Sequence, residues 1–217
     1  MALWEIRALL LEMFRQWGFP LAIRTDNGEP FGVPTRDVVP ILSLWLLAWG
    51  VKPVLNRPRR PQDNGKVERN QGTASRWAEV YGCPDIQTLQ ATLDDACDLQ
   101  RNHYPVKKLG NAARNAVFPS LNEIARPFDE TLFDEKKAYA QLEKALYPRK
   151  VAANGSICIY GKVFQIGHKY RGQVVYLKFQ AQNLAWLAFG QPGGDLINTI
   201  PDQRFSRDNL FNLTVCQ

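Results

Sequence analysis

The apolar segment VVPILSLWLLAW (38–49) constrains the fold of this chain more than any other. It predicts a helix over about residues 37–49 that is apolar on every side and therefore largely buried, with Pro40 tolerated only in its first turn. Two short apolar segments flank it. PLAIRTD (20–26) ends at an Asn-Gly turn signal, and WGVKPVLN (49–56) leads through RPRRPQDNG into a further helix. Strand, helix, strand and helix in this order predict a parallel sheet of the α/β class.

Other segments predict further helices and then a change to β structure. Apolar residues at helical spacing predict helices over 3–17, ended by Gly18 and Pro20, over 86–101 and over 133–146. After Pro148 the chain consists of short runs rich in Val, Ile, Tyr and Phe, each closed by Gly, Asn or a polar turn. These runs are KVAANG, SICIYG, KVFQIG, QVVYLKF and LAWLAF. They predict five or six short strands of a small β-barrel, with a domain boundary near residue 147.

The charge of the chain is unevenly distributed. With 217 residues, 45% of them apolar, the chain can form one large or two small domains. The net charge of +6 arises mainly from residues 52–76, with seven basic and two acidic residues, and from residues 144–194, with seven basic residues and no acid. Clustered Lys and Arg are typical of a polyphosphate partner, so we expect a nucleic acid. The alternative is a basic surface without such a partner.

Several classes of protein are disfavoured. No apolar run reaches the roughly 18 residues of a membrane span, and MALWEIRALLLEMF is spaced like an amphipathic helix rather than a signal peptide. We therefore expect a cytoplasmic protein that does not bind membranes. The four cysteines form no CxxC motif, and with two histidines they cannot assemble a zinc site. We expect reduced and mostly buried thiols.

Two carboxylates are candidates for chemistry. Asp26 follows a predicted strand, and Glu68 lies early in a predicted helix among basic residues. Each alone has an ordinary explanation, because Asp-Asn-Gly is a common turn and most helix glutamates face water. Together they can converge on a hard cation such as Mg²⁺, or Mn²⁺, with basic residues nearby to hold phosphates. That combination suits phosphodiester chemistry.

The stretches RTDNGEPF (24–31) and WGVKPVLNRPRRPQDNGKVERNQGT (49–73) resemble the catalytic core of DDE transposases and retroviral-type integrases. The segment RKVAANGSICIYGKVFQIGHKYRGQVVYLKF (149–179) is similar to the C-terminal barrel of Mu-like and insertion-sequence transposases. The resemblance implies an α/β fold with a partial RNase H-like core over 1–105, a helical linker over 106–147, and a small DNA-binding β-barrel over 148–217. It also implies that Asp26 and Glu68 are the second and third catalytic carboxylates and ligands of Mg²⁺ or Mn²⁺.

The chain departs from the family pattern in one respect. Such enzymes carry a first catalytic Asp on an earlier strand, whereas only 25 residues precede Asp26 here. Glu5 and Glu12 lie there, but on a predicted amphipathic helix. We expect a truncated core that lacks its first strands, with an incomplete metal site and an open strand edge at residues 21–26.

The resemblance also assigns basic residues to DNA. One group is expected to contact phosphate near the reacting strand: Arg59, Arg60, Lys66, Arg69 and Arg76. A second group is expected to give the barrel a sequence-independent grip: Lys162, Lys169, Arg171 and Lys178. Four aromatic residues are interpreted as core rather than base-stacking: Trp77, Tyr160, Tyr176 and Trp186.

The function that follows is DNA integration and transposition by Mg²⁺-dependent phosphodiester cleavage and strand transfer. The partners would be double-stranded DNA, as transposon ends and target, and either further copies of the chain or an intact transposase. A catalytically inactive DNA-binding remnant or regulator is the alternative. A plain interaction protein is a third reading, which the acid-free block 144–194 argues against.

Overall fold

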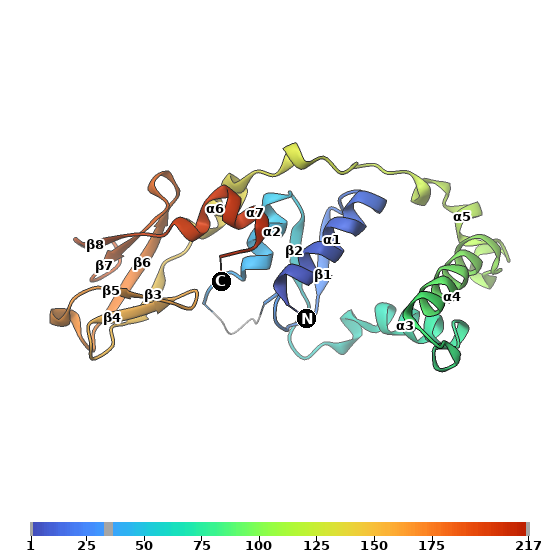
Figure 1. The fold of residues 1–217 in the computed structure, drawn as a ribbon, viewed down its shortest axis with the longest axis horizontal. Coiled ribbons are helices and arrows are strands. Elements are labelled where there is room, and N and C mark those ends of the chain that lie inside the picture. Colours follow the sequence, from blue (N-terminus) through green and yellow to red (C-terminus); the bar gives the residue numbers. More distant parts are fainter. Residues whose placement is uncertain (1, 33–36, 216–217) are drawn as a thin grey trace. The chain divides into compact units, whose positions relative to one another are not determined.

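The computed structural model describes residues 2–32 and 37–215 and has a mixed α/β fold (Figure 1). Its contacts group residues into two compact units. Unit 1 comprises residues 1–55 and 127–217, and unit 2 comprises residues 56–126. The domain boundaries expected near residues 105 and 147 stay predictions.

Unit 1 begins with a helix and a parallel pair of strands. Helix α1 (Leu3–Trp17) ends where the sequence predicted, at Gly18, whose φ is 75° and whose N–H donates to the Phe14 carbonyl at 2.8 Å. Strands β1 (Ala22–Thr25) and β2 (Lys52–Leu55) run parallel in register, with Ala22 opposite Lys52. The predicted parallel pairing is confirmed.

Helix α2 (Ile41–Ala48) connects these two strands and is buried, as predicted. Leu42, Leu44, Trp45, Leu46 and Ala48 are all 0% exposed. The helix begins about four residues later than predicted, because a residue that precedes proline avoids the α region and Pro40 follows Val39. Pro40 is instead the N-cap, with an extended ψ of 144°.

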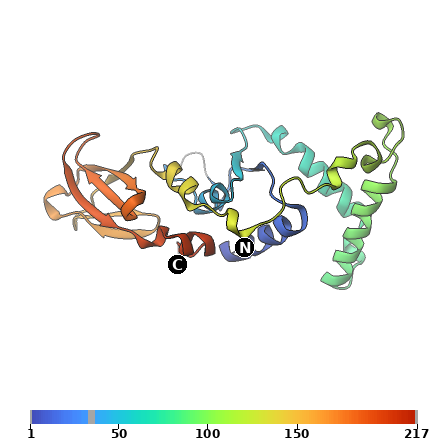
Figure 2. The same ribbon diagram turned by 90° about the horizontal axis from the view of Figure 1, so that it is seen from above.

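The second part of unit 1 contains helix α6 (Glu135–Leu142), six strands and helix α7 (Arg207–Asn212). Four strands form an antiparallel sheet in the order β3-β6-β7-β8. These are β3 (Tyr147–Lys150), β6 (Val174–Gln180), β7 (Ala185–Phe189) and β8 (Leu196–Pro201). The other two, β4 (Ser156–Ile159) and β5 (Lys162–Gln165), form a separate hairpin. Figure 2 shows this β-rich segment, coloured orange, from a second side.

The expected small barrel is not closed among the described strands. Contacts between aromatic side chains, rather than further backbone pairing, link the β4–β5 hairpin to the four-stranded sheet. Tyr160, at the hairpin turn, lies 6.1 Å from Trp186 of β7 and 5.2 Å from Phe205, measured between ring centroids. Trp186 and Phe205 are both fully buried. Hairpin and sheet are therefore joined by side-chain packing, and four-residue strands offer little backbone for a second ladder.

A core of aromatic residues unites the two chain segments of unit 1. Trp45 of α2 donates its indole N–H to the Phe211 carbonyl of α7 at 3.0 Å, and Arg7 of α1 donates to the same oxygen at 2.8 Å. Trp49 packs against Phe133 and Phe211, with ring centroids 5.0 and 5.8 Å away. Residues more than 150 positions apart therefore share one core.

Unit 2 contains helices α3 (Gly65–Trp77), α4 (Ile86–Asp98) and α5 (Arg114–Val117), and α3 packs against α4 (Figure 1). The predicted helix over 86–101 is confirmed, since α4 continues as a π-helical turn over Leu99–His103. Asp85 caps α4 by accepting from the Thr88 N–H at 2.6 Å, and this bond lowers the pKa of its carboxyl group. Where side-chain burial is described in unit 2, only Asn56, Ala78 and Ala96 are buried. Most side chains of this unit are therefore open to partners.

The expectation of mostly buried cysteines is wrong. Cys97 and Cys158 are exposed and Cys83 is half-buried, each with a free thiol, while Cys216 lies outside the described residues. Cys97 and Cys158 occupy outward-facing positions on α4 and β4, which explains the difference. Across residues 2–32 and 37–215, no helix combines the length and the apolar character needed to span a bilayer.

Candidate nucleic-acid interface

Asp26 lies in unit 1, directly after β1, and its side chain is exposed. It makes no hydrogen bond or ion pair with the rest of the described chain. Its neighbour Asn27 is half-buried, and the Asn27 Oδ1 atom is buried without a hydrogen-bond partner among these residues. A buried oxygen of this kind normally has a hydrogen-bond partner. The turn after β1 therefore contains two side chains, Asp26 and Asn27, whose oxygen atoms are available as metal ligands.

Glu68 lies in unit 2, in the first turn of α3, and is also exposed without a described partner. The loop before it is held by Arg57 and Asp63. Arg57 donates from Nη2 to Asp63 Oδ1 at 2.7 Å and from its backbone N–H and Nε to Oδ2 at 3.1 Å. This hydrogen-bonded ion pair raises the pKa of Arg57. Asp63 is therefore occupied in shaping the loop, which leaves Glu68 as the available carboxylate at the start of α3.

A cleft of about 400 Å³ runs along one face of α3. Positions three, four and seven apart share a helix face, so α3 lines the cleft with Lys66, Arg69, Asn70, Thr73, Arg76 and Trp77. The opposite side comes from later in unit 2, as Gln100, Tyr104 and Arg114. The lining contains four cations and no Asp or Glu, which makes the cleft suited to an anion.

Hydrogen bonds to backbone carbonyls orient two of the cleft cations. Arg76 donates from Nε to the Gly72 carbonyl at 3.0 Å, and Arg114 donates from Nη1 to the Gln100 carbonyl at 2.7 Å. Each bond uses one of the five N–H groups of a guanidinium, so donors remain for a ligand. Within the described residues, none of the four cations forms an ion pair.

Of the five basic residues expected near the reacting strand, three line this cleft. These are Lys66, Arg69 and Arg76. Arg59 and Arg60 are exposed in the preceding loop and do not line it. Arg59 has a φ of 57°, a left-handed conformation in the turn that brings the chain to Asp63.

The four basic residues expected on the barrel are exposed on unit 1, at separate places. Lys162 lies on β5 with Nζ 5.3 Å from the Phe164 ring centroid, and Lys169 lies with Nζ 4.9 Å from that of Tyr170. Arg171 follows Tyr170, and Lys178 occupies an outward position on β6. Lys162 also lines the cavity of unit 1, whereas the other three line neither cavity nor cleft, so the four form a dispersed basic surface rather than one site.

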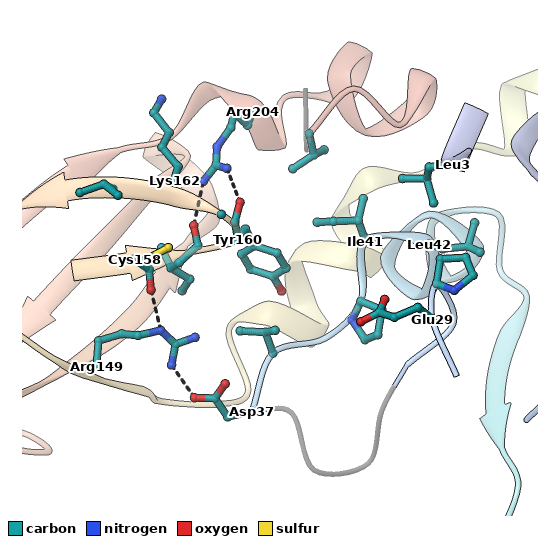
Figure 3. A pocket seen from close by; sticks show the side chains of 17 residues that line it. Leu3, Glu29, Asp37, Ile41, Leu42, Arg149, Cys158, Tyr160, Lys162 and Arg204 are labelled. Carbon is teal, nitrogen blue, oxygen red and sulfur yellow. Dashed lines mark hydrogen bonds and ion pairs between the residues drawn. The ribbon is translucent and has the colours of Figure 1, made fainter. Parts of the chain in front are cut away.

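Unit 1 has its own cavity of about 980 Å³, shown in Figure 3. Arg149 forms an ion pair with Asp37 and donates from Nε to the Cys158 carbonyl at 2.9 Å. Arg204 donates to the carbonyls of Ile159 and Tyr160 at 3.3 and 2.8 Å. These guanidinium groups are committed to partners within the protein. The cavity is therefore less suited to a polyanion than the cleft on α3.

The sequence did not assign six of the nine cleft residues to a site: Asn70, Thr73, Trp77, Gln100, Tyr104 and Arg114. Trp77 was interpreted as core, although its position four after Thr73 and seven after Asn70 places it on the cleft-lining face of α3. Tyr104 and Arg114 carry no local sequence signal, because the turn over 99–103 and the packing of α5 bring them to the cleft.

A comparison with known protein families found no family model that matches this chain. The class of protein is therefore defined by its fold and by the candidate site. The chain is a mixed α/β protein with an acid-free cationic cleft in unit 2 and a dispersed basic surface on unit 1.

Proposed function

We propose that the chain is a DDE-type transposase or integrase polypeptide, with an RNase H-like core and a DNA-binding β-rich segment, that acts in DNA integration and transposition. The observation that carries this proposal is the cationic face of α3, which lies on the same helix as Glu68. Phosphate oxygens are the ligands that such a face binds. The motif RTDNGEPF and the motif PQDNGKVER supply the same assignment from the sequence.

The proposal includes Asp26 and Glu68 as ligands of Mg²⁺ or Mn²⁺. The donor chemistry fits, since both carboxylates are exposed without described partners and Asn27 Oδ1 is an unsatisfied oxygen beside Asp26. When bound, the ion would activate water or a DNA 3′-hydroxyl for attack on a phosphodiester. Lys66 and Arg69 would hold the phosphates and offset the charge that develops there.

The test compares DNA binding and strand joining in Mg²⁺ and in EDTA. We expect Mg²⁺ to strengthen DNA binding, and Asp26→Asn and Glu68→Gln each to remove that gain. Glu79→Gln is the matched control, because Glu79 is exposed in unit 2 and does not line the cleft. A Mg²⁺ effect that survives in both carboxylate variants would contradict the proposal.

A catalytically inactive DNA-binding protein, one that occupies transposon ends or joins an intact transposase, is the second candidate. It is favoured by the absence of any carboxylate from the lining of the α3 cleft, since phosphate binding there needs no metal ion. In this case DNA binds equally well in EDTA, and Asp26→Asn has no effect. Mg²⁺-dependent joining of DNA strands would exclude it.

A further inference from the structure

The α3 cleft combines cations with an aromatic pair. The Trp77 and Tyr104 rings lie with centroids 5.0 Å apart and planes tilted by 50°. Trp77 is half-buried, whereas Tyr104 is 45% exposed and lines the cleft. No base fits between rings this close, but the outer surface of Tyr104 is open to one.

Packing alone accounts for only part of this arrangement. An aromatic pair can simply fasten α3 to the turn at residues 99–103. It does not explain four cations gathered around the pair without an acid, since like charges in proximity repel one another. A ligand that carries negative charge and also has an uncharged part that stacks on an aromatic ring accounts for both the four cations and the aromatic pair.

Polar groups that can read a base lie on the same surface. Asn70 and Gln100 line the cleft, and each amide carries both donors and an acceptor. The Asn70 side chain makes no hydrogen bond within the described residues. The cleft thus offers charge for a phosphate, a ring for a base and amides for the base edge.

We propose that this cleft binds an unpaired nucleotide of DNA, either in a single-stranded overhang or flipped out of a duplex. Its volume of about 400 Å³ lies at the small end of the range for single-ligand pockets, roughly 300–1,000 Å³. In the interior of duplex DNA both faces of a base are covered by its neighbours, so away from the duplex ends only an unpaired base can stack on Tyr104. Arg76 and Arg114 bind the flanking phosphates, and Trp77 supports the Tyr104 ring.

This inference rests on the proposed function, because it names the form of DNA that unit 2 holds. Its test uses the full chain in EDTA, so that the carboxylates do not contribute. The probes are a blunt duplex and the same duplex with a three-nucleotide 3′ overhang that carries 2-aminopurine. We expect the overhang to bind about tenfold more tightly, which is within the contribution of one base–aromatic stack, and the fluorescence of 2-aminopurine to fall on binding.

Three variants separate stacking from other effects. Tyr104→Ala should remove the preference for the overhang, and Tyr104→Phe, which keeps the ring, should retain it. Tyr81→Ala is the matched control, because Tyr81 is the fully exposed tyrosine of the same unit and does not line the cleft. Circular dichroism of each variant checks that unit 2 keeps its helices.

The outcomes distinguish this inference from the proposed function. Equal binding of both duplexes, or a preference that persists in Tyr104→Ala, would overturn the unpaired-nucleotide site and leave DNA binding intact. Failure of either duplex to bind at low salt would overturn both. Loss of the preference in Tyr104→Phe as well would show that the phenolic hydroxyl, not stacking, makes the contact, which also contradicts the proposal.

Discussion

Asp202 illustrates how a buried charge is accommodated in unit 1. Its side chain is 0% exposed and accepts from the Trp186 indole N–H at 3.1 Å and from Arg204 Nε and Nη2 at 2.8 and 2.7 Å. Arg204 in turn donates to two carbonyls at the end of the β4–β5 hairpin. An isolated buried carboxylate is strongly unfavourable, but every partner here is a donor. The network therefore fastens hairpin to sheet.

Two buried tyrosines make the stability of unit 1 depend on pH in the alkaline range. Burial raises the pKa of Tyr139 and of Tyr147 from 10.0 to about 12. Because the folded state keeps these protons longer than the unfolded state, their contribution is complete below pH 10 and is lost as the pH rises towards 12. The loss is roughly 2–3 kcal/mol for each tyrosine.

We expect Tyr139→Phe to reduce this alkaline loss, because phenylalanine has no proton to lose. At neutral pH the same change should cost about 1 kcal/mol, the hydrogen bond that Tyr139 donates to the Phe205 carbonyl at 2.7 Å. Urea unfolding at neutral pH and between pH 10 and 12 measures both effects. Tyr81→Phe, at an exposed site, should change neither. An unchanged pH dependence in Tyr139→Phe would contradict the assignment.

At the scale of elements, α2 and its C-cap contribute two tryptophans to the core of unit 1, Trp45 and Trp49, which differ in one hydrogen bond. Trp45 donates to the Phe211 carbonyl, whereas the Trp49 indole N–H is buried without a partner among the described residues. Replacement by phenylalanine removes similar volume at both sites. We expect Trp45→Phe to lower the free energy of unfolding by about 1 kcal/mol more than Trp49→Phe. Urea unfolding of the two variants tests this order, and equal or reversed costs would contradict it.

The sequence predicted elements whose signal is local. The helix over 3–17, the helix that begins at Ile86 and the parallel order of the strands around α2 are confirmed. Helix α7 was not predicted, because six residues, RDNLFN, are too few to show a helical period. The union of residues 1–55 with 127–217 was not predicted either, because it depends on contacts such as that of Trp49 with Phe211.

The residues of the candidate site also divide into those with a local sequence signal and those brought in by tertiary contacts. The resemblance grouped Lys66, Arg69 and Arg76 with Arg59 and Arg60 as expected phosphate contacts, and only the first three line one cleft. Tyr104 and Arg114 reach that cleft only through tertiary packing, so no local pattern could include them. The roles of Asp26 and Glu68 remain predictions, since they depend on a resemblance rather than on contacts within either unit.

At the scale of the whole molecule, positive charge is concentrated in two places. Unit 2 has the α3 cleft, while the acids of α4, including Asp94, Asp95 and Asp98, do not line it. Unit 1 has exposed lysines on its β-rich segment, which contains no acid over residues 144–194. A long polyanion can engage both, whereas a small anion engages one.

Salt dependence measures whether one DNA molecule contacts both units. Each neutralised phosphate contact changes the slope of log K against log salt by about 0.9 for duplex DNA. We therefore expect Lys66→Gln in unit 2 and Lys178→Gln in unit 1 each to make the slope shallower by about 0.9, and the double variant by about twice as much. Lys136→Gln is the matched control, because Lys136 is exposed on α6 outside both basic regions. If Lys178→Gln leaves the slope unchanged while Lys66→Gln reduces it, DNA contacts unit 2 alone. The dispersed basic surface of unit 1 would then have no part in binding.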